Sequence, residues 1–140
     1  GLAMPHSPRM HQGKLYVLNS GYGSFGQVDM TTGKYEEIER SPGYTRGLTL
    51  YGQFAFVGLS QIRETSVFGG LPIADKVQDL CCGIGIIDMN TGRTVAVLKF
   101  VTGVAEIFAV DVIPGMTMPH FAGSTIGDVE QEIWIVPSSI

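Results

Sequence analysis

Long hydrophobic runs are missing from this chain of 140 residues, although 44% of its residues are hydrophobic. No segment approaches the roughly 18 to 20 consecutive apolar residues that a membrane-spanning helix requires, so we expect no membrane partner. Positive charge is also scarce, with 9 Lys and Arg against 13 Asp and Glu, and the basic residues are scattered along the chain. A phosphate backbone is bound by a basic patch, so we expect no nucleic-acid partner either.

Cysteine is nearly absent. The two that occur, Cys81 and Cys82, are neighbours, and a bridge between adjacent residues is strained and closes no useful loop. We therefore expect two reduced thiols, because a redox switch or a metal site needs ligands that the local sequence lacks. The N-terminus has no basic and apolar regions of the kind found in a signal peptide, which predicts a cytoplasmic location. Since the chain begins with Gly1 and not with Met, its natural N-terminus is left open.

What the chain does have is a repeated turn. Val28–Lys34 and Ile87–Arg93 both read as an apolar residue, Asp, Met, two turn-forming residues, Gly and a base. β-Branched residues lie nearby, which is typical of a strand, a tight turn and a returning strand. Gly13–Leu18 and Gly52–Val57 repeat at an offset of 39 residues as a Gly turn followed by an apolar and aromatic strand, and Glu132–Val136 resembles a third copy.

These repeats predict four-stranded antiparallel units and an all-β fold in a single domain, residues 1–140. In each unit the last strand follows the repeated turn. Within the insertion of the second unit we expect a short helix that begins at Leu71 and Pro72, with Ile73, Val77 and Leu80 on one face. The first unit is predicted at about residues 2–40, the second at about 44–100 with an insertion at 61–82, and a partial third at about 106–140. The outer strands of the first two units are predicted at 35–40 and 94–100.

Four-stranded units at a period near 40 residues are typical of a β-propeller. Propellers close with about four to eight blades, whereas this chain supplies about two and a half. The predicted fold is therefore a propeller-like stack whose ends something else must cover, either further chains or the rest of a longer protein. Uncovered blade faces and edges favour aggregation, so we expect a homo-oligomer, most simply a dimer.

Five segments carry a resemblance to known sequences: Gly1–Arg9, Leu18–Gly21, Thr45–Leu48, Phe56–Ser60 and Phe68–Ile73. Together with Arg63 and Glu64 they are similar to a bacterial family of propeller-like proteins that is conserved and uncharacterised. The resemblance covers about residues 1–115 and fades after Gly115. It implies a propeller-like fold and members that are longer at the N-terminus, and it implies no particular activity.

The histidines are candidate metal ligands. His6 and His11 are five residues apart, a spacing that places two side chains on opposite faces of a regular strand. Zinc requires three or more converging ligands, and Glu106 and Asp111 are the groups that could join His6. Such a site would make the protein a metal-dependent propeller enzyme, for instance a hydrolase or lactonase. The other interpretation is that the histidines are structural or exposed, and that no metal or other cofactor is bound.

Arginine suggests a second kind of site. Arg9 and Arg46 fall near the predicted innermost strands, which line the channel of a propeller, and Arg63 and Glu64 open the insertion. A guanidinium group forks onto carboxylate or phosphate oxygens, which would suit a small anionic ligand; the alternative is an ion pair between blades, for instance with Glu64 or Glu106. The candidate ligand-binding residues are therefore His6, Arg9, Arg46, Arg63, Glu64 and Glu106.

Other motifs lack the structural context that their usual function requires. Gly21–Gly26 has glycines at the spacing of a dinucleotide fingerprint, but it leads into a strand and not into a helix. Asp29 and Asp88 are expected to cap their turns through side-chain hydrogen bonds. No serine lies in a nucleophile elbow. The predicted function is a propeller-type binding or assembly module for a small ligand, with an anion as one option, or for a protein partner; whether the chain is an enzyme is left open.

Overall fold

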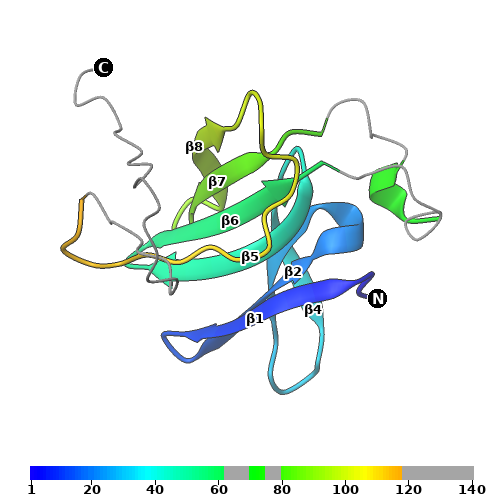
Figure 1. The fold of residues 1–140 in the computed structure, drawn as a ribbon. Helices are drawn as coiled ribbons and strands as arrows, with labels where there is room; N and C mark the ends of the chain where they lie inside the picture. The colour runs from blue at the N-terminus through cyan, green and yellow to red at the C-terminus, as the bar shows by residue number, and fades with distance from the viewer. Residues whose placement is uncertain (62–69, 75–79, 118–140) are drawn as a thin grey trace, which may run out of the picture.

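The computed structural model describes residues 1–61, 70–74 and 80–117, which form two four-stranded antiparallel sheets (Figure 1). In both sheets the strands follow one another in chain order, so the predicted all-β fold with two four-stranded units is confirmed. Within this part of the chain no helix has the length and apolar character needed to cross a membrane. Sheet A consists of β1 (Pro5–His11), β2 (Lys14–Asn19), β3 (Ser24–Val28) and β4 (Tyr35–Arg40), with the short 3-10 turn η1 (Ser20–Tyr22) between β2 and β3; sheet B consists of β5 (Tyr44–Tyr51), β6 (Phe54–Ser60), β7 (Gly83–Asp88) and β8 (Arg93–Lys99).

The repeated turn forms as predicted, once in each sheet. The Asp29 carboxylate accepts hydrogen bonds from the N–H groups of Thr31, at 2.8 Å, and Thr32, at 2.9 Å. Asp88 accepts the corresponding bond from the N–H of Asn90, at 2.9 Å. An Asp side chain that caps its own turn holds the chain reversal locally, so the same hairpin recurs wherever this sequence recurs.

The first hairpins of the two sheets share an irregularity. In sheet A His6 pairs with Leu18, and in sheet B Thr45 pairs with Leu59. Just beyond both pairs, the first strand carries one residue more than its partner, which is a β-bulge. His6 of sheet A is therefore equivalent to Thr45 of sheet B, and Leu18 is equivalent to Leu59.

The bulge overturns one prediction. His6 and His11 pair with Leu18 and Lys14, which lie on one face of the regular strand β2. The two histidines therefore share that face and do not lie on opposite faces, because the extra residue between them reverses the alternation. They remain apart: His6 contacts the buried Ser20, whereas the His11 ring nitrogen Nε2 lies 3.0 Å from the Gly52 carbonyl.

The core lies between the facing surfaces of the two sheets. Leu18 and Phe25 of sheet A pack against Leu48, Val57 and Leu59 of sheet B, and all five side chains are fully buried. Each such burial contributes about 1.5–3 kcal/mol relative to an exposed side chain. At the outer end, the Thr94 N–H on β8 donates to the Glu39 carboxylate on β4, at 2.8 Å. Sheets A and B are therefore joined along both their inner and their outer strands.

The insertion is described only in part. Residues 72–74 form one 3-10 turn, in which the Ala74 N–H donates to the Leu71 carbonyl at 2.9 Å. The continuation of the predicted helix, Val77 included, lies outside the described residues, as do the predicted strand Glu132–Val136 and the pair Arg63 and Glu64. Cys81 and Cys82, just before β7, are buried free thiols, as expected.

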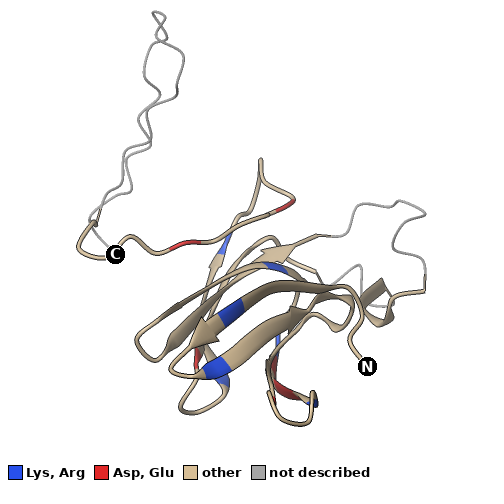
Figure 2. Cartoon of the chain, turned by 90° about the horizontal axis from the view of Figure 1, so that it is seen from below, with Lys and Arg blue, Asp and Glu red and all other residues tan. Residues whose placement is uncertain are grey.

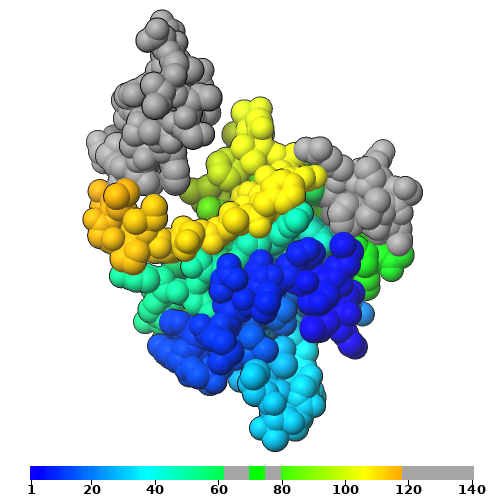
Figure 3. All heavy atoms as spheres, turned by 60° about the horizontal axis from the view of Figure 1, so that its bottom comes forward, coloured from blue at the N-terminus to red at the C-terminus, as the bar shows by residue number. Residues whose placement is uncertain are grey.

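Residues 101–117 belong to neither sheet and run along sheet B. Figure 3 shows this segment, in yellow and orange, lying against β5 next to the blue β1. The Gln61 N–H donates to the Ala105 carbonyl at 2.9 Å, and the Ile107 N–H donates to the Ser60 hydroxyl oxygen at 2.8 Å. These hydrogen bonds attach the segment to the end of β6. The residues of the segment that take part lie at the predicted start of the third unit.

Candidate functional site

The structure brings three of the six predicted ligand-binding residues to one region. His6 lies near the start of β1, Arg46 near the start of β5, and Glu106 on the segment that covers sheet B. Arg9 lies farther along β1, is exposed, and donates from Nη1 to the Pro8 carbonyl at 3.1 Å. Over the described residues, Lys and Arg positions are distributed over several strands (Figure 2).

His6 belongs to a hydrogen-bond network that links the two sheets. Its Nδ1 lies 3.0 Å from the Met4 carbonyl and 2.8 Å from the Ser20 hydroxyl oxygen. A carbonyl can only accept, so Nδ1 carries the proton. The fully buried Ser20 hydroxyl in turn donates to the Thr45 carbonyl, at 2.5 Å.

This arrangement does not activate the serine. In nucleophilic catalysis a neutral histidine nitrogen accepts the serine proton, whereas here Nδ1 donates and the serine proton is directed at Thr45. Ser20 also has no exposed surface for a substrate to reach. The contact between Ser20 and His6 is therefore a structural link between β1, η1 and β5. Within the described residues, the Nε2 atom of His6 has no hydrogen-bond partner and is the ring nitrogen left for a ligand.

Tyr44 joins the histidine to the neighbouring pocket. Its ring meets the His6 ring edge to face, with 5.8 Å between the centroids, and its hydroxyl lies 3.5 Å from Nδ1. Burial raises the pKa of the Tyr44 phenol, while the nearby Arg46 charge and a hydrogen bond with Ser20 act in the opposite direction. The phenol is therefore neutral at physiological pH and serves as a hydrogen-bonding group.

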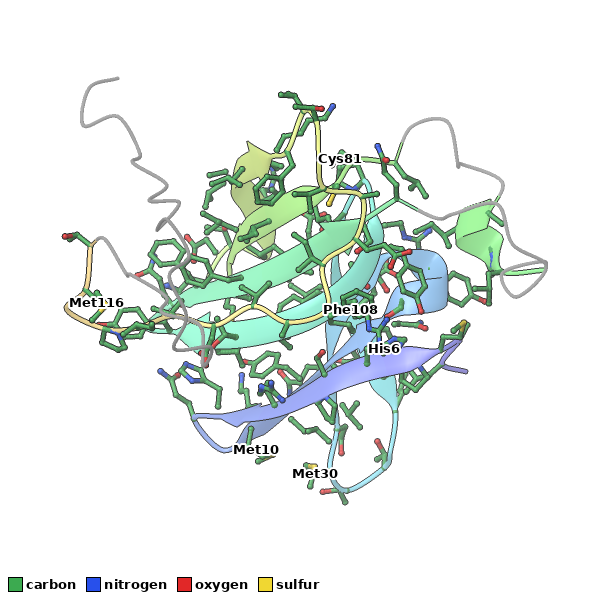
Figure 4. The ribbon with its side chains drawn as sticks, viewed as in Figure 1. His6, Met10, Met30, Cys81, Phe108 and Met116 are labelled. Atoms are coloured by element: carbon green, nitrogen blue, oxygen red, sulfur yellow. The ribbon has the colours of Figure 1, made fainter. Side chains whose placement is uncertain are left out.

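A pocket of about 120 Å³ opens beside Tyr44, between β5, the end of β6 and the covering segment. The Arg46 guanidinium carbon lies 4.3 Å from the centroid of the Phe108 ring, within cation–π distance. Figure 4 shows His6 and Phe108 on the same side of the molecule. The volume equals about four water molecules at roughly 30 Å³ each, which suits a ligand of acetate or phosphate size. The lining residues are Tyr44, Arg46, Ser60, Gln61, Glu106, Ile107 and Phe108.

Two glycines allow the covering segment to lie this close to sheet B. A Cβ atom on Gly58 would lie 2.9 Å from Ile107 Cγ2 and 3.1 Å from Val110 Cγ2. Gly47 has φ +81°, and a Cβ atom there would lie 2.8 Å from the Val110 backbone nitrogen. The pocket therefore depends on the absence of side chains at two positions under the segment.

The proposed metal ligands do not meet. Among the described residues, no group of three or more His, Cys, Asp or Glu side chains is placed to hold a metal ion, so His6, Glu106 and Asp111 form no such group. Asp111 instead accepts hydrogen bonds from the Thr49 hydroxyl, at 3.3 Å, and the Val112 N–H, at 2.9 Å. This geometry gives the metal-dependent enzyme no support.

Sequence reasoning missed three members of the site: Ser20, Tyr44 and Phe108. Tyr44 has a signal in the sequence, because it precedes Arg46 by two residues on a predicted innermost strand. Phe108 follows Glu106 by two residues in the same way. Alternation places residues i and i+2 on one face of a strand, so both aromatics could have been grouped with the charged residues already chosen.

Comparisons with known proteins place the chain in a family and go no further. No curated protein and no solved structure matches the sequence. The family described as "Domain of unknown function (DUF4915)" matches residues 1–121. The chain therefore belongs to the DUF4915 family.

Proposed function

We propose that this chain is a β-propeller-type binding module that holds a small anion in the pocket beside Arg46. The observation that carries the proposal is the Arg46 guanidinium, held over the Phe108 ring in a pocket of anion size. A stacked guanidinium is preorganised and keeps its edge available, so it loses little side-chain freedom when it binds a carboxylate or phosphate. Tyr44 lines the same pocket.

The propeller part of the proposal is supported by a repeated contact between layers. The Ser20 hydroxyl, just after β2, donates to the Thr45 carbonyl on the first strand of the next sheet. The Ser60 hydroxyl, at the end of β6, donates to the Ile107 carbonyl at 3.2 Å. In both places a serine hydroxyl at or just after the end of the second strand donates to a carbonyl of the next layer, which supports residues 101–117 as the inner strand of a third blade.

A turn at the end of this segment agrees with the same assignment. The Met116 N–H donates to the Ile113 carbonyl at 3.3 Å, with Pro114 and Gly115 between them and φ +75° at the glycine. Pro followed by Gly at positive φ is typical of a type II turn, which reverses the chain. Both β1 and β5 also end in a tight turn that contains a glycine, Gly13 and Gly52.

The face of sheet B that residues 101–117 cover in part supports association with further blades. Phe56, Ile84, Ile86 and Leu98 share this face by their pairing, and Leu98 is 52% exposed. A propeller blade is normally covered on both faces, so we expect copies of this chain to associate, most simply as a dimer.

Light scattering measures this association. Leu98→Lys should yield the monomer, whereas Met30→Lys, at an exposed turn of sheet A, should leave the oligomer intact. A wild-type monomer would contradict the association.

Thermal unfolding with sodium phosphate and sodium acetate tests the anion pocket. A bound anion at about 100 times its Kd stabilises the folded chain by about 2.7 kcal/mol. Arg46→Gln should abolish this gain. Arg9→Gln is the matched control, because it removes an exposed charge from an inner strand outside the pocket. Equal stabilisation of wild type and Arg46→Gln, or none in wild type, would contradict the proposal.

A further inference from the structure

We propose a second binding site, in the hollow between η1, the β4–β5 connection and the insertion, for a small molecule with an apolar ring and one anionic group. The hollow measures about 440 Å³, against about 120 Å³ for the pocket beside Arg46. Binding sites for small molecules commonly span about 300–1,000 Å³ and are lined mainly by apolar side chains with a few polar groups. The second hollow therefore has room for a ring system, which the first does not.

Its floor is apolar and well packed. Ile73 and Leu80 of the insertion are 4% and 8% exposed and cluster with Tyr44 and Leu71. Tyr22 of η1 lines the same hollow as a partly exposed aromatic ring. An aromatic or alicyclic ring packed against these side chains would be removed from water, which is the main source of affinity for such a ligand.

Backbone hydrogen bonds fix the walls in place. The Ser41 N–H donates to the Gly23 carbonyl at 2.9 Å, which ties the β4–β5 connection to the end of η1. The Cys81 N–H donates to the Pro42 carbonyl at 2.8 Å, which ties the end of the insertion to the same connection. A hollow whose walls are already joined requires little ordering when a ligand enters.

The polar groups of the hollow define the ligand's head. The Arg40 guanidinium lines the hollow and lies 5.9 Å from the Tyr22 ring centroid. One of its nitrogens, Nη2, donates to the Glu37 carboxylate at 2.7 Å, which leaves further N–H donors of the guanidinium for a second acceptor. Ser41 also lines the hollow, but its hydroxyl oxygen is buried and does not reach a ligand there. A cation beside apolar walls matches a carboxylate attached to a ring.

Calorimetric titration with 2-naphthoate and its neutral analogue 2-naphthamide tests the site on the intact chain. We expect one molecule of naphthoate per chain and weaker binding of naphthamide. Arg40→Gln should weaken naphthoate by about fivefold, the value of a partly exposed ion pair, and leave naphthamide unchanged. Glu37→Gln should strengthen naphthoate, because Arg40 then has no competing carboxylate. Tyr22→Ala should weaken both probes.

Arg93→Gln is the control, since it removes an exposed charge on β8, away from the hollow. Tyr22 and Arg40 are exposed enough for their variants to fold, and thermal unfolding verifies this independently. Failure of wild type to bind either probe would overturn the site. Binding that survives Tyr22→Ala would also overturn it. Equal affinities for naphthoate and naphthamide, unchanged in Arg40→Gln, would overturn the anionic part of the assignment.

Discussion

Replacing Ser20 by alanine should destabilise the whole chain, because this one hydroxyl links both sheets. It accepts the His6 Nδ1–H and donates to the Thr45 carbonyl at a position with no exposed surface. Alanine fits the same space, so the substitution removes the hydrogen bonds without leaving a large cavity. The His6 proton keeps the Met4 carbonyl as a partner, whereas the Thr45 carbonyl loses its bond to the hydroxyl.

The expected loss of stability in Ser20→Ala comes from the Thr45 carbonyl, which is the group left without its hydroxyl partner. A buried polar group that loses its partner costs about 1–3 kcal/mol, so we expect Ser20→Ala to lower the free energy of unfolding by about 2 kcal/mol. For a domain of this size the midpoint of thermal unfolding should fall by roughly 6 °C. Urea unfolding followed by circular dichroism measures the change, with an unchanged slope against denaturant. A loss within about 0.5 kcal/mol of zero would refute the reasoning, because it would be no larger than that of a neutral surface change.

Ser60→Ala is the matched variant, because Ser60 makes the corresponding contact with the covering segment. Its hydroxyl accepts the Ile107 N–H and donates to the Ile107 carbonyl. The segment joins no sheet, so we expect it to open locally: hydrogen exchange at the Ile107 amide should quicken about tenfold or more, with a smaller loss of global stability than in Ser20→Ala. Equal global losses in the two variants would show that the segment unfolds together with the sheets.

Three further predictions concern the supporting structure. Gly58→Ala should cost about 1–3 kcal/mol in urea unfolding, because the new methyl group overlaps the Arg46 carbonyl and the Ile107 side chain; full stability would contradict the tight contact. Hydrogen bonds from the Thr32 and Thr31 N–H groups lower the pKa of Asp29 below 3.8, so its carboxylate stabilises the fold above the unfolded pKa, and this contribution is lost as the pH falls through the folded pKa. An NMR titration midpoint for Asp29 at or above 3.8 would contradict this. Burial raises the pKa of the Cys82 thiol, so a thiol reagent should label it only after unfolding, and rapid labelling of the native chain would show that it is accessible.

The strands and turns were predictable because their causes are local. Asp29 and Asp88 bond to residues two or three positions ahead, so the hairpin is encoded within a few residues and repeats with its sequence. The face occupied by His11 was not predictable, because the bulge after His6 arises from pairing with β2 and not from the local pattern. The pocket was predictable in part: Arg46 is predicted near an inner strand and Glu106 as a possible ion-pair partner, whereas their proximity depends on Gly47 and Gly58, which let the covering segment approach.

The divergence between the two sheets indicates where a function can lie. Leu18 and Leu59 occupy equivalent positions and are identical and fully buried, so they serve the packing that both sheets need. His6 is equivalent to Thr45, and the next residue, within the bulge, is Ser7 in sheet A and Arg46 in sheet B. A repeated scaffold needs the same backbone at these inner positions but does not require particular side chains. Residues that differ there, beside a pocket, are therefore the ones most free to have been selected for a ligand.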